Sequence, residues 1–167
     1  MPFPKYEQNH VVSECLAGWT QHTNKCYNFF SAKKQWTDAR NECLVQVEMQ
    51  ASGSWKSGYI GKVDLASVPD MATNNFLASL ESTEEAWIGA TDAENEGHWR
   101  WSDGTRMSFT NWADGEPNNH YHGKEDYALT NYHGIAGRWN DFSNDNGDGK
   151  SFFCQYILYP RDNSQFL

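Results

Sequence analysis

The sequence lacks a long hydrophobic run, and it lacks an excess of positive charge. No stretch of about 18 consecutive apolar residues occurs among its 167 residues, which excludes a membrane-spanning helix. Its 13 Lys and Arg residues face 22 Asp and Glu residues, for a net charge of −9. A nucleic-acid backbone requires a basic surface, so a nucleic-acid partner is excluded as well.

The signatures of common hydrolases are also absent. The sequence contains neither Gly-x-Ser-x-Gly nor His-Glu-x-x-His, and no cysteine-nucleophile pattern. His120, His122 and Glu125 have the spacing of a His-x-His metal site, but histidines in polar loops more often belong to the surface. A binding protein is therefore favoured over an enzyme.

Cysteine is scarce, with 4 residues, and its spacing does not fit a zinc site. Cys15 and Cys26 are close enough in sequence to close a short covalent hairpin, whereas a Cys43–Cys154 bond would tie together the two ends of a domain. In the chain-entropy model, closing a loop of about 110 residues stabilises the fold by roughly 4–5 kcal/mol. The alternative is four buried thiols in a reducing compartment. We favour the two disulfides, and with them a secreted, extracellular protein.

The amino-terminal residues Met1 to Lys5 lack the apolar core of a signal peptide. We therefore expect either a cytosolic chain or one whose leader has been removed. The length predicts one domain, and an aromatic content of 15% is sufficient for a packed core.

Hydrophobic periodicity predicts both helices and strands. Helices are expected over 31–44, with Ser31 as the capping residue, and over 69–80. Loops are expected over 50–62 and 110–126, and the second is long enough to suggest a functional role. Short strands are predicted at 25–30, 87–90, 98–101, 128–130, 137–139 and 152–157.

One segment is rich in oxygen-bearing side chains. The stretch from Trp112 to Asp141 contains Glu116-Pro117-Asn118, then Glu125-Asp126, and ends with Trp139-Asn140-Asp141. Cations of the calcium type take six to eight oxygen ligands from carboxylates, amides and backbone carbonyls. The segment could supply most of such a shell, so we expect a calcium site here.

The order and spacing of several motifs resemble those of C-type lectin domains. These motifs are Cys15-Leu16-Ala17-Gly18-Trp19, Cys26-Tyr27-Asn28-Phe29, Trp36 through Cys43, Trp87-Ile88-Gly89, Glu116-Pro117-Asn118, Trp139-Asn140-Asp141 and Cys154. The resemblance covers residues 15–157, with an extension at 1–14 and a tail at 158–167. It implies an α+β fold with two helices, two small antiparallel sheets and a long calcium-binding loop.

The resemblance also implies two groups of calcium ligands. The Ca²⁺ ion that contacts the sugar would be held by Glu116, Asn118, Glu125, Asn140 and Asp141. A second, bracing Ca²⁺ would be held by Asp92, Glu96, Asn119 and Asp126, with Glu125 shared between the two groups.

The chemistry of these residues agrees with the resemblance. A cis Glu116–Pro117 bond would direct the flanking side chains toward one point, and cis bonds are nearly confined to proline. Carboxylates accept hydrogen bonds from sugar hydroxyls, and Asn amides donate to the hydroxyl oxygens. One departure from the family is that its usual second loop disulfide is missing, with Tyr127 and about Asn144 in the corresponding places. The loop must therefore depend more on calcium and on packing.

The choice of sugar is open between two readings. Glu-Pro-Asn in this family usually accompanies mannose, glucose or fucose. The insert at 119–124 places Tyr121 and His122 beside the site, and an aromatic ring there suits the apolar face of galactose. We favour galactose slightly and expect both aromatic residues to bind carbohydrate.

The expected partners are glycans with a terminal hexose. A lectin-like domain that binds protein, ice or mineral is the main rival, but such members often lose sugar-site ligands, and all five are present here. A single shallow site binds weakly, so a homodimer or higher oligomer is expected to supply avidity.

Overall fold

The computed structural model describes residues 14–51, 60–145 and 147–159. Within these ranges the chain forms two α-helices, α1 (Trp36–Ala51) and α2 (Met71–Leu80), and a short 3₁₀ helix, η2 (Tyr132–Gly134). None of these helices is long and apolar enough to cross a bilayer. The strands are β1 (Thr20–His22), β2 (Lys25–Lys34), β3 (Ile60–Leu65), β4 (Ala86–Thr91), β5 (Arg100–Trp101), β6 (Tyr127–Thr130), β7 (Asn140–Phe142) and β8 (Lys150–Leu158).

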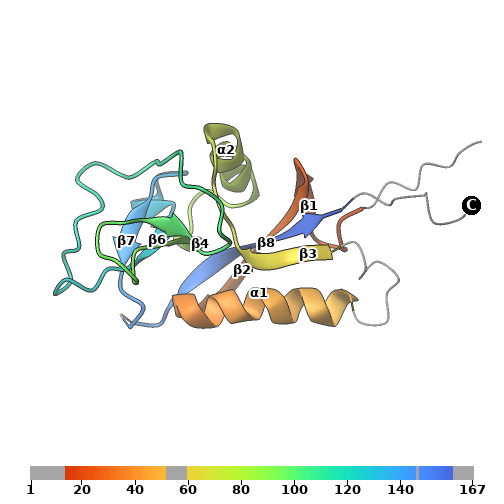
Figure 1. Ribbon diagram of the computed structural model, residues 1–167, viewed down its shortest axis with the longest axis horizontal. Coiled ribbons are helices and arrows are strands. Elements are labelled where there is room, and N and C mark those ends of the chain that lie inside the picture. The colour runs from red at the N-terminus through yellow and green to blue at the C-terminus, as the bar shows by residue number, and fades with distance from the viewer. Residues whose placement is uncertain (1–13, 52–59, 146, 160–167) are drawn as a thin grey trace, which may run out of the picture.

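The strands form one connected sheet in the order β1-β2-β8-β4-β6-β7, with β3 also on β8 and β5 also on β4. Most pairings are antiparallel, but β4 and β8 run parallel through only Ala86↔Ser151 and Trp87↔Phe152. Figure 1 shows α1 along one face of β2, β8 and β3, with the β4-β6-β7 half beyond its amino-terminal end. The expected α+β class is confirmed, whereas the two expected sheets are joined into one by this short parallel pairing of β4 and β8.

Both predicted disulfides are present. Cys15–Cys26 fastens the start of the domain to β2, and Cys43–Cys154 joins α1 to β8 with an S–S distance of 2.03 Å. Every cysteine is paired, which excludes the alternative of four thiols. The second bond crosses the interface between α1 and the sheet, where Trp36 is buried and donates from its indole nitrogen to the Ile88 carbonyl at 2.8 Å.

The helix predicted at 31–44 is wrong at both ends. Residues 31–34 belong to β2, because its register with β8 extends to Lys34↔Lys150, and Ser31 caps no helix. The helix begins at Trp36 and continues to Ala51, since Val47 and Ala51 extend its buried stripe by two turns. The second helix begins after Pro69, where the Asp70 carboxylate caps the Thr73 amide at 2.7 Å.

Two strand predictions and one loop prediction also need correction. The strand expected at 137–139 lies three residues later, as β7, because Gly137 has a φ of 72° and Trp139 forms only an isolated bridge. The strand expected at 98–101 contains only Arg100 and Trp101. Of the loop expected at 50–62, residues 52–59 lie outside the described ranges, whereas 60–62 belong to β3 and 50–51 to α1.

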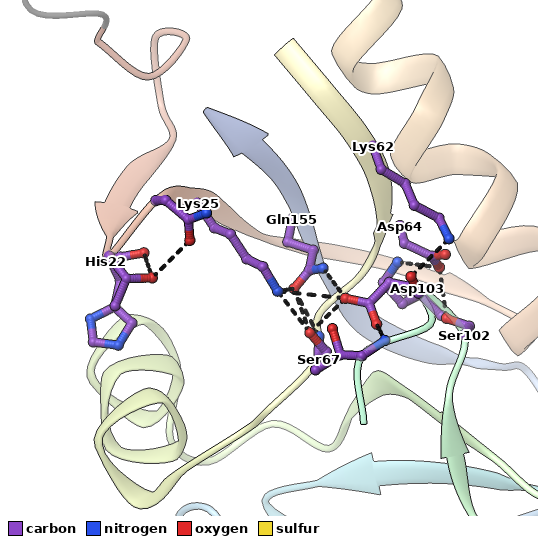
Figure 2. Close-up of polar contacts among 12 residues, drawn as sticks. His22, Lys25, Lys62, Asp64, Ser67, Ser102, Asp103 and Gln155 are labelled. Atoms are coloured by element: carbon purple, nitrogen blue, oxygen red, sulfur yellow. Dashed lines mark hydrogen bonds and ion pairs between the residues drawn. The ribbon is translucent and has the colours of Figure 1, made fainter. Parts of the chain in front are cut away.

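A buried polar network joins β2 and β8 to the turn after β5, as Figure 2 shows. The Lys25 ammonium donates to the Ser67 hydroxyl at 2.9 Å and lies 3.5 Å from the Asp103 carboxylate. Gln155 donates to Asp103 at 2.7 Å and accepts from the Ser67 amide at 2.8 Å. Burying charge is costly unless hydrogen bonds compensate, and here each member has several partners.

A second buried carboxylate, Asp64, is held by Arg40. Two parallel bonds of 3.0 Å join the guanidinium to the carboxylate, and the Ser102 hydroxyl donates to Asp64 at 2.7 Å. Arg40 lies on α1 and Asp64 on β3, so this pair fixes the helix across the sheet.

Replacing Arg40 by methionine should destabilise the domain by about 2–3 kcal/mol, because it leaves the Asp64 charge buried without its cation. Urea unfolding monitored by tryptophan fluorescence measures this change. Arg100→Met is the matched control: it breaks the exposed pair with Glu94, and its cost should stay below about 1 kcal/mol. Equal losses in the two variants would contradict the assignment of the Arg40–Asp64 pair.

Candidate calcium and sugar site

The long loop before β6 is anchored to the core by tryptophans. Trp139 is fully buried, and its indole nitrogen donates to the Asn74 side chain at 2.9 Å. Trp112 packs edge-on against Trp139 with ring centroids 5.7 Å apart, and the Ala113 amide donates to the Trp139 carbonyl at 2.8 Å. Trp139 therefore anchors the loop in the core and sets the position of the next residues, Asn140 and Asp141.

The Glu116–Pro117 peptide bond is cis, as expected. Beyond it, the Asn118 side chain donates to the Glu116 carboxylate at 3.0 Å. The two oxygens of Asp141 accept from the backbone amides of Asn118 and Asn119 at 3.1 and 2.7 Å. Asp141 is 1% exposed, so these contacts clamp the loop against β7 from inside.

Glu125 approaches the same place from the far end of the loop. Its carboxylate accepts from the His120 amide at 2.7 Å, and its own amide donates to the Asn119 side chain at 3.0 Å. A depression of about 260 Å³ opens here. It is lined by Glu85, Glu116, Asn118, His120, Glu125, Tyr132, His133, Asn140 and Phe142. Four of the five predicted sugar-site ligands therefore share one depression, and the fifth, Asp141, holds the loop that forms it.

The carboxylates of this depression are electrostatically unbalanced. Burial, followed by contact with Asp141 and then by the charge of Glu125, raises the pKa of Glu116 to about 7. Burial also raises the pKa of Glu125. The second oxygen of Glu116, Oε2, is buried without a hydrogen-bond partner among the described residues. Oxygen ligands crowded in this way suit a hard divalent cation.

The second predicted cluster also comes together. Ligand oxygens of Asp92, Glu96 and Asp126 all lie within 4.8 Å of one another. One oxygen of Asp92, Oδ1, is buried without a partner in the described chain, while the other accepts from the Gly97 amide at 2.8 Å. Desolvation and then the charge of Asp92 raise the pKa values of Glu96 and Asp126, whereas hydrogen bonding from Asn119 lowers that of Glu96. Asn119 therefore touches both clusters.

The aromatic residues at the depression are not the pair expected from the sequence. Tyr121 and His122 are exposed, pack edge-to-face at 5.1 Å, and are not among the lining residues. The lining rings are those of His120, Tyr132, His133 and Phe142, and the rings of Tyr132 and His133 are stacked with centroids 3.9 Å apart.

Some lining residues carried no recognisable sequence signal. Tyr132 and His133 sit in η2, where His133 has a left-handed φ of 53° that no periodicity predicts. Glu85 reaches the wall because its carboxylate accepts from the His133 amide at 3.2 Å. Of the lining residues that the prediction did not include, His120 is the one with a sequence signal, because it belongs to the aromatic insert after Glu116-Pro117-Asn118.

The fold and this site define a class of protein, and comparison with known families identifies it. Residues 60–156 match the family described as the Lectin C-type domain. The chain belongs to this family, whose members are binding domains rather than enzymes.

Known relatives include proteins named for different sugars. Galactose-specific lectin nattectin from Thalassophryne nattereri is 31% identical over 136 residues, which are 78% of this chain and 74% of that protein. Human C-type mannose receptor 2 is 32% identical over 142 residues, which are 84% of this chain but only 8% of the receptor. The crystal structure of C-type lectin CEL-I from Cucumaria echinata superimposes with a TM-score of 0.71 at 29% identity, covering 87% of this chain and 99% of CEL-I.

Calcium affinity should fall as the pH drops below about 7. Because the pKa of Glu116 is raised in the calcium-free protein, protons compete with the cation for this carboxylate, at a cost of about tenfold in affinity per pH unit for one displaced proton. The same raised pKa makes the calcium-free fold less stable as the pH rises from the ordinary value of 4.5 toward 7. Calorimetric titration with CaCl₂ at about pH 8 and pH 6 measures the first effect.

The control for this experiment is Glu94→Gln, which changes an exposed carboxylate outside both clusters. It should reproduce the wild-type dependence on pH, whereas Glu116→Gln should bind calcium weakly at both pH values. Equal wild-type affinities at the two pH values would contradict a role for Glu116 as a ligand.

Proposed function

We propose that this chain is a calcium-dependent lectin that binds two adjacent hydroxyls of a terminal hexose at the depression around Glu116. The observation that carries the proposal is the crowding of Glu116, Glu125 and Asp141, in which one buried oxygen of Glu116 has no hydrogen-bond partner in the described part of the chain. The ligands of the calcium ion would be the five residues predicted above. Calcium would supply the positive charge that attracts the hydroxyls, while the carboxylates accept their protons and the Asn amides donate to their oxygens.

We propose that a second calcium at Asp92, Glu96, Asn119 and Asp126 braces the loop without touching sugar. The positions where the family usually has a loop disulfide make other contacts here. Tyr127 packs against Trp36 of α1 with ring centroids 4.6 Å apart, and the Asn144 side chain accepts from the Thr37 amide at 3.2 Å. These contacts attach both positions to α1. The order of the loop between them would therefore depend on the proposed calcium ions.

The sugar we propose is of the galactose type. The wall of His120, Tyr132 and His133 offers aromatic faces on which the apolar face of a galactose ring can pack. One relative, nattectin, is named galactose-specific, whereas the Glu-Pro-Asn motif and the relative named mannose receptor favour mannose. Tyr121 and His122 remain candidates for contact with outer parts of the ligand.

We also propose that the protein works outside the cell and as a dimer or higher oligomer. The two disulfides are typical of oxidising compartments. A depression of about 260 Å³ offers few contacts to a single sugar, so binding to a glycosylated surface depends on several sites acting together.

Removal of both calcium ions should lower the melting temperature by roughly 10–20 °C. This follows if each ion is present at about 100 times its dissociation constant and stabilises the fold by about 2.7 kcal/mol. Differential scanning calorimetry in CaCl₂ and in EDTA measures the difference. Asp92→Asn should reduce this difference in melting temperature. Asp114→Asn, which changes an exposed carboxylate of the long loop before β6, should leave the difference unchanged. Coincident melting temperatures would rule out calcium bracing.

Sugar binding can be tested by affinity chromatography. In calcium, the protein should be retained on lactose-agarose, released by EDTA, and pass through mannan-agarose. Asn118→Ala should abolish retention because it removes a ligand and a hydrogen-bond donor, while Asn95→Ala, outside the depression, should be retained as the wild type is. Retention on mannan-agarose alone would contradict the galactose-type ligand and indicate a mannose-type ligand instead. Absence of retention on any sugar matrix would favour a protein or mineral partner.

A further inference from the structure

Asn131 is a buried polar residue that directly precedes two of the rings in the candidate sugar depression. It is 1% exposed, and its φ of 61° lies in the left-handed region, which asparagine adopts more readily than most residues do. The next two residues, Tyr132 and His133, line the depression, whereas Asn131 does not. An effect of Asn131 on a bound sugar would therefore be transmitted through these two rings.

One end of the Asn131 side chain closes the segment that joins β6 to β7, here called the 131–138 loop. The side-chain oxygen accepts from the Gly137 amide at 3.0 Å. Two backbone bonds close the same loop: the Tyr132 amide donates to the Arg138 carbonyl at 3.0 Å, and the Gly134 amide donates to the Asn131 carbonyl at 2.9 Å. The start of the loop is therefore fastened to its end directly beside the two rings.

The other end of the Asn131 side chain holds this loop on the turn that precedes β4. Its amino group donates to the carbonyls of Glu81 and Glu84, at 3.1 Å each. The turn is itself braced, because the Glu81 carboxylate accepts from the amides of Thr83 and Glu84 at 2.7 and 3.0 Å. The three side-chain bonds of Asn131 thus go to backbone groups on both sides of the junction between the turn and the loop.

The rings carried by the 131–138 loop lie close to the proposed calcium ligands. Tyr132 and His133 are stacked with centroids 3.9 Å apart, so a shift of the loop would move both rings together. Burial, followed by the charge of Glu116, raises the pKa of Tyr132, which places its ring beside the ligand carboxylates. The position of the loop therefore determines the shape of the aromatic wall.

We propose that Asn131 is a positioning residue that sets the sugar preference of the site by fixing the Tyr132 and His133 rings. This inference rests on the proposed function and deepens it, because it names the residue that orders the galactose-selecting wall. A ring that is already held in place loses little freedom when a sugar packs on it. Coordination of two hydroxyls by calcium does not require the wall, so loss of Asn131 should change sugar preference and leave calcium binding intact.

Asn131→Gly removes the three side-chain bonds, and glycine adopts the left-handed φ without strain. Calorimetric titrations in calcium with methyl β-galactoside and methyl α-mannoside give the ratio of the two affinities. This ratio should fall about tenfold in the variant, because the galactoside loses its packing on the rings. Calcium affinity should stay within about twofold of the wild type, since the side-chain bonds of Asn131 in the described chain go to residues outside the proposed ligand sets.

A second variant and a mutant cycle separate positioning from a purely structural role. Asn131→Asp keeps the acceptor for Gly137 but loses both donors to the turn, and should lower the ratio by a similar factor. In a background carrying Tyr132→Ala and His133→Ala, Asn131→Gly should leave the ratio unchanged, because the rings that it positions are gone. A further fall in that background would contradict action through the rings.

The matched control is Ser67→Ala, which removes buried hydrogen bonds to Asp103 and Gln155 at a residue outside the depression. It should lower the melting temperature and keep the wild-type ratio. An unchanged ratio in Asn131→Gly, or an equal fall in Ser67→Ala, would overturn the role of Asn131 and leave the lectin function standing. A wild type that prefers the mannoside would overturn the galactose-type ligand and the role of Asn131 together. Failure of the wild type to bind either glycoside in calcium would overturn the proposed function, and this inference with it.

Discussion

Pairing along β8 is the constraint on which the rest of the domain depends. This strand is hydrogen-bonded to β2, β3 and β4, and its Cys154 is covalently joined to α1. Its pairing with β4 is only two residues long, yet it attaches the half of the sheet that carries both candidate calcium-ligand clusters. The geometry of the site therefore depends on a narrow connection, and its paired residues Trp87 and Phe152 are both fully buried in the same core cluster.

The candidate site brings together carboxylates that repel one another. Glu116, Glu125 and Asp141 are brought together by backbone contacts, chiefly the two loop amides that donate to Asp141. Without a cation, burial and the neighbouring carboxylates raise the pKa of Glu116 to about 7, and burial raises the pKa of Glu125. Crowding of these carboxylates lowers the stability of the fold unless a cation is bound. Such a cluster is typical of a preorganised cation site.

Much of this arrangement could be predicted from sequence because it rests on short-range signals. The cysteine spacing predicted both disulfides, and the proline of Glu116-Pro117-Asn118 predicted the cis peptide bond. Prediction failed where long-range pairing decided the outcome. Residues 31–34 have an unremarkable local pattern, and only their register with β8 places them in a strand. Tyr132 and His133 reach the depression through left-handed turns and a contact with Glu85, 48 residues away in sequence, which no local pattern encodes.

The contacts of Asn119 affect how the two candidate ions would bind. Its side-chain oxygen accepts from the Glu125 amide, its backbone amide donates to Asp141, and its hydrogen bonding influences Glu96 in the other cluster. An ion that draws this side chain into one arrangement alters the ligands available to the other. By thermodynamic reciprocity, each ion then changes the affinity for its neighbour by the same factor. Binding of the two proposed ions would thus be coupled, and neither site could be altered at Asn119 without changing the other.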